Sequence, residues 1–236
     1  MSKEDKKSEG KYFILYKFAT RSRPDKFISG IENIVNLSSD KNNFKILVSA
    51  DIDDATMYNK DVLNRIYNHI KSGLVEIHYG NSKSKIDAIN RDMDKAGEWD
   101  ILVNFSDDMQ FIKNGFDETI RNDFKINFPD LSGNLHYNDG FQKDRISTMS
   151  IFGKGWYDRF KYIYHPDYKS LFCDEEYTYV ARKLNKMVYI QDIIFNHNHP
   201  ANVGGMVDEQ LRKTESFWDE DRNTFERRSK NNFDLN

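Results

Sequence analysis

The first half of the chain alternates short apolar segments with segments of helical periodicity, and no other feature of the sequence constrains the fold as strongly. Four apolar segments have no helical period, which predicts strands that are buried on both faces. These segments are residues 12–18, 44–50, 74–78 and 101–105. The residues between them carry apolar side chains at helical spacing, and Pro24 suits the first turn of the first helix. Short connections between alternating strands and helices predict an α/β fold with a parallel sheet and right-handed crossovers.

The second half of the chain has a different pattern. Shorter strands are predicted at 133–138 and 147–152, a helix at 175–186 and a further strand at 187–195. The charges of residues 209–230 balance in sign, which predicts a solvated C-terminal helix. The sequence contains neither an internal repeat nor a long linker, so we expect one domain with two functional halves.

Composition narrows the class of protein. The net charge of −3 and the pI near 6.1 give no global basic field for nucleic acid, although a local basic groove is still compatible with them. The single Cys173 excludes an intramolecular disulfide and a multi-cysteine zinc site, and it is typical of a reducing compartment. No apolar run approaches the roughly 20 residues of a membrane span, and the charged N-terminus lacks the apolar core of a signal peptide. We therefore expect a cytoplasmic protein.

Polar and acidic side chains follow three of the predicted strands. They are Thr20-Arg21-Ser22-Arg23, Asp51 with Asp53, and Ser106-Asp107-Asp108. Carboxyl ends of parallel strands meet at one edge of a sheet, where open α/β sheets bind ligands. The adjacent Asp107 and Asp108 can hold a hard divalent cation and, through it, a phosphate. Taken alone, helix capping or a turn explains these two aspartates equally well.

The usual phosphate-binding loops are missing. The sequence has no GxGxxG fingerprint after the first strand and no GxxxxGK[ST], so neither a dinucleotide-binding Rossmann site nor a Walker P-loop is indicated. A metal ion would then have to neutralise a bound diphosphate.

In the order of these motifs, residues 12–205 resemble a GT-A-fold glycosyltransferase of the family 2 type. The resemblance implies a Rossmann-like, mostly parallel sheet flanked by helices, with a smaller mixed region on the acceptor side. It implies a nucleoside-diphosphate sugar as donor, with a UDP-sugar favoured because the family uses it most. The residues that it places beside the donor are Thr20, Arg21, Arg23, Asp51, Asn81, Lys85, Ser106 and Asp107. Ser106 departs from the Asp-x-Asp-type pattern and leaves one carboxylate fewer for the metal.

The resemblance assigns the metal ion to Asp108 and to a histidine near the C-terminus. Oxygen ligands suit Mg²⁺ or Mn²⁺, and an added imidazole favours Mn²⁺. His199 matches the family's C-terminal ligand, with His197 as the alternative. A single histidine is more often structural. Two histidines at alternate positions followed by Pro200 favour a site.

An acidic cluster, Asp174-Glu175-Glu176, resembles the motif that supplies the general base of inverting family 2 enzymes. Such a base takes the proton of the acceptor hydroxyl. Asp174 is favoured and Glu175 comes next, while spacing alone does not exclude Glu176. The alternative is a helix N-terminus enriched in acids that complement the macrodipole.

The acceptor region lies between the two motifs and contains His136, Tyr137, Asp139 and Trp156. Aromatic platforms for a sugar or a base fit there, although core packing explains Trp156 equally well. The Gln-x-x-Arg-Trp motif and the membrane helices of processive synthases are missing, which favours transfer of a single sugar. A glycan, a small molecule or a hydroxylated nucleic-acid base fits as acceptor. The last is suggested by a Lys- and Asn-rich composition reminiscent of phage enzymes, which would place the protein in the host cytoplasm.

The resemblance predicts a metal-dependent, inverting glycosyltransferase and divides the chain accordingly. Residues 1–10 are a disordered N-terminus, 11–110 the donor-binding half, 111–206 the acceptor and catalytic half, and 207–236 a charged C-terminal helix. Two other classes compete with this hypothesis. A nucleotidyltransferase that makes NDP-sugars shares the sheet and the metal chemistry, but it normally has a Gly-rich motif that residues 19–24 lack. A non-catalytic binding module with the same fold is the other alternative.

Overall fold

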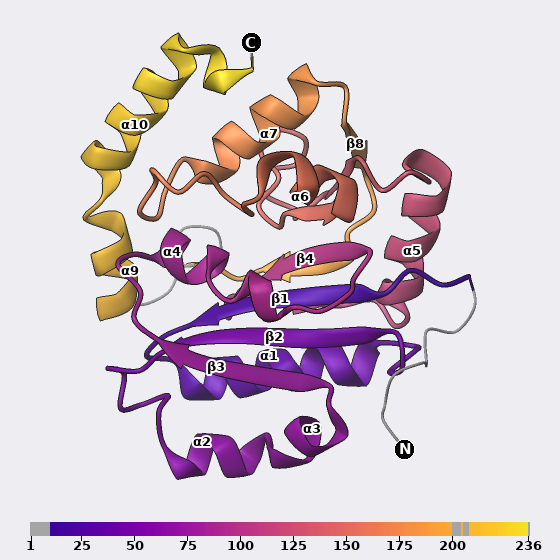
Figure 1. Cartoon of the computed structure of the whole chain (residues 1–236), viewed down its shortest axis with the longest axis vertical. Helices are drawn as coiled ribbons and strands as arrows, with labels where there is room; N and C mark the ends of the chain where they lie inside the picture. Colours follow the sequence, from indigo (N-terminus) through magenta and orange to yellow (C-terminus); the bar gives the residue numbers. More distant parts are fainter. Residues whose placement is uncertain (1–9, 200–203, 205–207, 236) are drawn as a thin grey trace.

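The computed structural model describes residues 10–199, 204 and 208–235, and a seven-stranded sheet forms its centre (Figure 1). The strand order is β3-β2-β1-β4-β7-β6-β8, and only β7 runs antiparallel to its neighbours. The strands are β1 (Ile14–Thr20), β2 (Phe44–Asp51), β3 (Val75–Gly80), β4 (Ile101–Phe105), β6 (Asn134–Tyr137), β7 (Ile151–Gly153) and β8 (Met187–Ile190). A separate antiparallel pair consists of β5 (Met109–Phe111) and β9 (Phe195–His197). The mostly parallel sheet with a smaller mixed region is therefore confirmed.

The register of the parallel strands aligns their carboxyl ends. Thr20 pairs with Ala50 across β1 and β2, Phe18 pairs with Phe105 across β1 and β4, and Asp51 pairs with Gly80 across β2 and β3. The polar segments that follow β1, β2, β3 and β4 consequently leave the sheet at one edge. This alignment places the predicted site residues together.

Helices cover both faces of the sheet (Figure 1). The α-helices are α1 (Pro24–Leu37), α2 (Lys60–Arg65), α3 (Tyr67–Ser72), α4 (Lys85–Asn90), α5 (Phe116–Asn127), α6 (Lys154–Phe160), α7 (Cys173–Lys183), α9 (Glu209–Glu215) and α10 (Trp218–Lys230). Alternate residues of β1 belong to two cores: Tyr16 and Phe18 pack with α1 and α5, and Leu15 packs with α4, α6 and α7. Within the described part of the chain, no helix is both long and apolar enough to cross a membrane.

Glycine at one position lets α1 pack closely on the sheet. A Cβ atom added to Gly30 would lie 3.1 Å from the rings of Phe18 and Phe105. A larger side chain there would push α1 away from β1 and β4. The N-terminus of α1, which carries Arg23, would then move relative to the sheet edge.

The structure divides three of the predicted elements into two each. The second helix is interrupted at Ile66, whose φ of −105° separates α2 from α3. The predicted strand 187–195 is two strands, because the chain leaves β8 after Ile190 and pairs again with β5 as β9. The C-terminal helix is likewise divided into α9 and α10.

Buried charges anchor α10, so the prediction of a purely solvated C-terminal helix is wrong. Arg228 is 4% exposed and forms a bidentate ion pair with Glu176 of α7, at 2.7 and 2.8 Å. Glu176 also accepts a hydrogen bond from the Tyr168 hydroxyl at 2.8 Å. Asp221 is completely buried and accepts the backbone N–H groups of residues 169–171. These buried contacts fix α10 against α7 and against residues 169–171.

Lys17 is a charged residue in the middle of the central strand. Its side chain is completely buried, and its ammonium donates a hydrogen bond to Ser49 Oγ. Ser49 in turn donates to Asp92 Oδ2 at 2.7 Å. Burial lowers the pKa of Lys17 from 10.5 to about 7, and Arg91 and Lys95 add to this effect while Asp92 opposes it. The buried charge therefore opposes folding at neutral pH.

We expect Lys17→Met to raise the free energy of unfolding at pH 7 by about 1–4 kcal/mol, because the variant removes a desolvated charge and keeps an apolar chain of similar length. The unfolded chain retains the pKa of 10.5 and the folded chain has about 7, so the unfolded state binds more protons between these values. The stability of the wild type accordingly rises with pH in that window, and the advantage of the variant shrinks. Urea denaturation at pH 6.5, 8 and 9.5 measures this convergence. Lys45→Met, which removes a part-buried lysine paired with Glu76, is the matched control. A loss of stability in Lys17→Met at pH 6.5 would contradict the prediction.

Candidate donor-binding and catalytic site

A cleft of about 650 Å³ lies at the carboxyl edge of the parallel strands. Its floor comes from the segments after β1, β2 and β4 and from the start of α4, and α9 with the start of α10 forms the opposite wall. The predicted residues that line it are Thr20, Arg21, Arg23, Asp51, Lys85, Ser106, Asp107, Asp108 and His199. Asn81 is exposed and does not line the cleft. The residues that follow it, Ser82 to Lys85, line the cleft instead.

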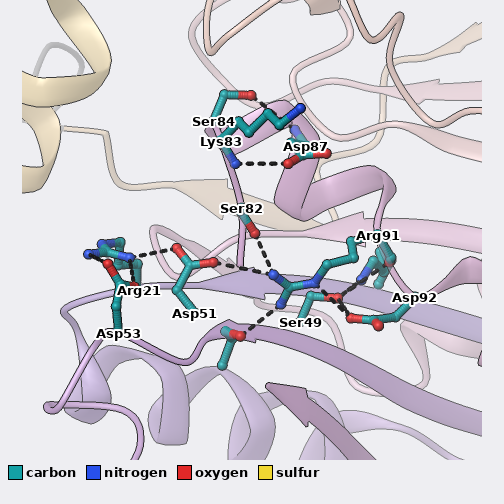
Figure 2. Close-up of polar contacts among 12 residues, drawn as sticks. Arg21, Ser49, Asp51, Asp53, Ser82, Lys83, Ser84, Asp87, Arg91 and Asp92 are labelled. Atoms are coloured by element: carbon teal, nitrogen blue, oxygen red, sulfur yellow. Dashed lines mark hydrogen bonds and ion pairs between the residues drawn. The ribbon is translucent and has the colours of Figure 1, made fainter. Parts of the chain in front are cut away.

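Two arginines hold Asp51 at one end of the cleft (Figure 2). Arg21 Nη1 lies 2.8 Å from Asp51 Oδ2 and 2.6 Å from Asp53 Oδ1. Arg91 Nη1 lies 3.4 Å from Asp51 Oδ1 and 2.5 Å from Ser82 Oγ, and its Nη2 donates to the carbonyl of Ala50 at 2.7 Å. These contacts immobilise the Asp51 carboxylate at the carboxyl end of β2. A fixed acceptor of this kind can select one hydrogen-bond pattern in a bound base.

Arg23 connects the floor of the cleft to the opposite wall. Its Nη1 lies 2.9 Å from Asp107 Oδ1, and its Nε and Nη2 donate to Asp208 at 2.8 and 2.7 Å. Asp208 is also the N-cap of α9, since its side chain accepts the N–H of Leu211 at 2.8 Å. A planar guanidinium in this position matches the geometry of phosphate oxygens.

Asp108 and the histidine segment are brought together by the pairing of β5 with β9. Met109 pairs with His197, and the N–H of Asn198 donates to the carbonyl of Asp108 at 2.7 Å. His197 Nε2 lies 3.5 Å from Asp108 Oδ2, and its Nδ1 lies 3.8 Å from Asp139 Oδ2. Burial by itself would lower the pKa of His197 and raise the pKa of Asp108. The pairing with carboxylates outweighs burial, so that the pKa of His197 is raised to about 9 and the pKa of Asp108 is lowered. His197 therefore lies between two carboxylates, whereas His199 lines the cleft.

A divalent cation fits the donor set at Asp108. Its Oδ1 is buried and accepts no hydrogen bond from the described residues. No group of three or more His, Cys, Asp or Glu side chains with an arrangement that could hold a metal ion occurs in the described ranges. Mg²⁺ and Mn²⁺ commonly bind through one or two protein ligands together with substrate phosphates and water. Asp108 and His199, on the wall of the cleft, are the residues that would hold such an ion.

The three acids at the start of α7 have different surroundings. Burial raises the pKa of Asp174, while the N–H of Glu175, Lys85 and His197 oppose this shift. Burial and the neighbouring Asp174 raise the pKa of Glu175. Glu176 is committed to Arg228 and Tyr168 and is not available as a base. The candidates for the general base are therefore Asp174 and Glu175. Of these two, Asp174 interacts electrostatically with Lys85 of the cleft and with His197.

Comparison with known proteins identifies the architecture. The sequence matches no protein-family model and no curated protein. The structure is similar to the mannosyltransferase PcManGT from Pyrobaculum calidifontis in complex with GDP-Man and Mn²⁺, with a TM-score of 0.64 and 11% identity, over 88% of this chain and 70% of that one. It is also similar to S. aureus TarS residues 1–349 in complex with UDP-GlcNAc, with a TM-score of 0.62 and 11% identity, over 86% of this chain and 64% of that one. The chain has a GT-A fold.

Most of the residues expected on the acceptor side of the GT-A fold are packed in the core. His136 is 1% exposed, contacts Tyr189 edge to face, and has a pKa lowered to about 4 by burial. The Tyr137 hydroxyl donates to Asp123 Oδ2 at 2.6 Å, and Trp156 packs against Phe160 and Tyr177. These three side chains are buried and do not line the cleft. Asp139 alone reaches the site, through His197.

The sequence analysis did not identify two residues that form ion pairs with predicted site residues. Arg91 follows α4 and approaches Asp51 only because the end of α4 packs beside β2. Asp208 approaches Arg23 from 185 residues further along the chain. Neither residue belongs to a motif or a periodic pattern, so the sequence carried no local signal for them.

Asp208→Asn tests whether the wall of the GT-A cleft competes with an anionic ligand for Arg23. The amide retains the N-cap acceptor but removes a negative charge beside Arg23. We expect the affinity for UDP to rise by up to about fivefold, since a solvent-exposed ion pair contributes at most about 1 kcal/mol. Calorimetric titration at low salt measures it, with the exposed Asp25→Asn as control. Weaker binding would instead mean that Asp208 holds Arg23 in its binding orientation.

Proposed function

We propose that this chain is a metal-dependent, inverting glycosyltransferase that moves one sugar from a nucleoside-diphosphate sugar to an acceptor hydroxyl. The observation that carries the proposal is one cleft that combines a fixed Asp51, cationic groups for a diphosphate, and Asp108 with its unpaired buried oxygen. The GT-A fold supports it, as do the nucleotide-sugar ligands of the two similar proteins. We favour a UDP-sugar as donor, with Mn²⁺ or Mg²⁺.

The residues act at different positions of the donor. Asp51 accepts hydrogen bonds from the base, and Arg21 and Arg91 keep its carboxylate in place. Arg23 and Lys85 bind phosphate oxygens, and Asp107 orients the ribose or the sugar. Asp108 and His199 would hold the cation, which would supply positive charge to stabilise the departing phosphate.

The acceptor hydroxyl needs a base on the side opposite the leaving group. Asp174 takes this role, because it lies in the first turn of α7, and the cleft residue Lys85 and the neighbouring His197 act on its charge. Its raised pKa makes it a better proton acceptor than an exposed aspartate. A glycan, a small molecule and a hydroxylated nucleic-acid base remain the acceptors to be compared.

Calorimetric titration of UDP with and without Mn²⁺, with GDP and CMP as controls, tests the donor site. Binding that depends on Mn²⁺ and prefers UDP is the expected result. A preference for GDP would change the donor and keep the function. The absence of binding to all three nucleotides would refute the transferase and favour a binding module with the same fold.

A further inference from the structure

A second cavity, of about 670 Å³, lies on the acceptor half beside α7. We call it the basic pocket. It lies between α7, α10 and the segment that follows β6, and Figure 1 shows α10 next to α7. Six of its lining residues carry the argument: Arg145, Glu175, Thr178, Tyr179, Arg182 and Lys183.

The cations of the basic pocket have neutral partners. Arg145 donates to Gln142 Oε1, Arg182 donates to the backbone carbonyls of residues 144 and 145, and Lys183 donates to Asn232 Oδ1. None of the three forms an ion pair with another of the residues that the structure describes. Arg228 of the adjacent α10, in contrast, is paired with Glu176. Glu175 is the one carboxylate among the lining residues, so the pocket carries an excess of positive charge.

Two segments of the chain lead from the candidate catalytic residues to the pocket. Helix α7 follows Ser170 and Leu171 of the donor cleft, carries Asp174 in its first turn, places Glu175 in the basic pocket, and ends with Arg182 and Lys183. The segment after β6 contains Asp139, beside His197, and leads to Arg145. Thr178 joins the two, because its hydroxyl accepts the N–H of Ser147 and donates to the carbonyl of Asp174. A ligand in the pocket therefore lies next to the acids from which the base was chosen.

The helix dipole explains only part of the positive charge of the basic pocket. Basic residues in the last turn of a helix complement its dipole, which accounts for Arg182 and Lys183. Arg145 comes from a loop, and its guanidinium is directed to a neutral amide. Its position in the pocket has no such explanation.

We propose that the basic pocket binds a phosphate group of the acceptor, so that the acceptor is a phosphate ester whose hydroxyl reaches Asp174. The role of the hydroxyl rests on the proposed transferase function, whereas the binding of the phosphate rests on the residues of the basic pocket. Guanidinium groups bind phosphate oxygens through paired N–H groups, and the ammonium of Lys183 adds a point charge. The ring of Tyr179, which is 47% exposed, offers a face to the sugar or base that carries the phosphate.

The test uses inorganic phosphate as probe and amide chemical shifts of the full chain, measured by NMR without nucleotide or metal. We expect shifts at residues 143–147 and 178–183, and an affinity about tenfold lower in Arg145→Gln, the loss typical of one charged hydrogen bond. Arg159→Gln, on the separate helix α6, is the matched control and retains the affinity. Arg182→Gln would remove contacts to the backbone of residues 144 and 145 as well as a phosphate ligand, so Lys183→Gln provides the second variant. Shifts confined to the donor cleft, or an unchanged affinity in both Arg145→Gln and Lys183→Gln, would overturn the proposal.

Two further arms identify the source of the phosphate. Glycerol 1-phosphate represents a small ester and a single-stranded oligonucleotide represents nucleic acid, and competition of either with the probe at the same amides supports the proposal. UDP titration of the same samples after addition of Mg²⁺, the metal that the proposed donor site accepts besides Mn²⁺, separates the two hypotheses. Phosphate binding without UDP binding removes the transferase and keeps the pocket, and the reverse removes the pocket alone.

Discussion

Asp108→Asn will abolish the Mn²⁺-dependent part of UDP binding and leave the fold intact. The amide has the shape of the carboxylate but lacks the charge, and it places a neutral group where Oδ1 has no partner among the described residues. The backbone of Asp108 keeps its bond with Asn198, so the β5–β9 pair is retained. Changes in the outer shell of a metal site already cost about 10–100-fold in affinity, and loss of a ligand should cost more.

Calorimetry with UDP and Mn²⁺ measures this effect, and thermal unfolding of the same sample checks the fold. Asp130→Asn, in an exposed loop after α5, is the control. Equal Mn²⁺ dependence in Asp108→Asn and in the wild type would place the metal elsewhere. His199→Ala should weaken the metal dependence more than His197→Ala, since both ring nitrogens of His197 face carboxylates.

Asp174→Asn will lower the rate of sugar transfer by about 10²–10⁴-fold and will leave UDP binding unchanged. An amide cannot accept the proton of the acceptor hydroxyl. It can still accept the N–H of Glu175, which Asp174 Oδ1 binds at 3.0 Å, so the first turn of α7 is preserved. Release of UDP from UDP-sugars, with a panel of hydroxylated acceptors, measures the rate.

Glu175→Gln is the matched control for this second experiment, because it removes the adjacent carboxylate from the same helical turn. A full rate in Asp174→Asn together with a large loss in Glu175→Gln would reassign the base to Glu175. Full rates in both variants would exclude a carboxylate of α7 as the base and favour a retaining reaction. Glu176→Gln should lower the free energy of unfolding rather than remove a base, because it breaks the buried ion pair with Arg228.

The sheet edge was predictable because strand patterning is local. Apolar runs without helical period marked β1, β2, β3 and β4, and the alignment of parallel strands then required Thr20, Asp51 and Ser106 to meet at one edge. Burial of both faces of β1, β2 and β4 fixes this arrangement, whereas the edge strand β3 is only partly buried. The fold class and most of the cleft floor therefore followed from residues that are close together in the chain.

The same patterns could not separate a binding residue from a core residue in the second half. His136, Tyr137 and Trp156 have side chains that suit either role, and their burial is decided by what packs on them. Glu176 looked equivalent to its two neighbours. Its assignment depended on Arg228, which lies 52 residues away on α10.

Local sequence was thus sufficient for the parallel sheet, for the residues at its carboxyl edge and for the acidic start of α7, because periodicity and strand direction are properties of short segments. The partner of each charged group required the folded chain. Asp208 on Arg23, Arg91 on Asp51 and Arg228 on Glu176 are contacts between distant segments, and they form only when helix docking and loop paths bring complementary charges within hydrogen-bonding distance.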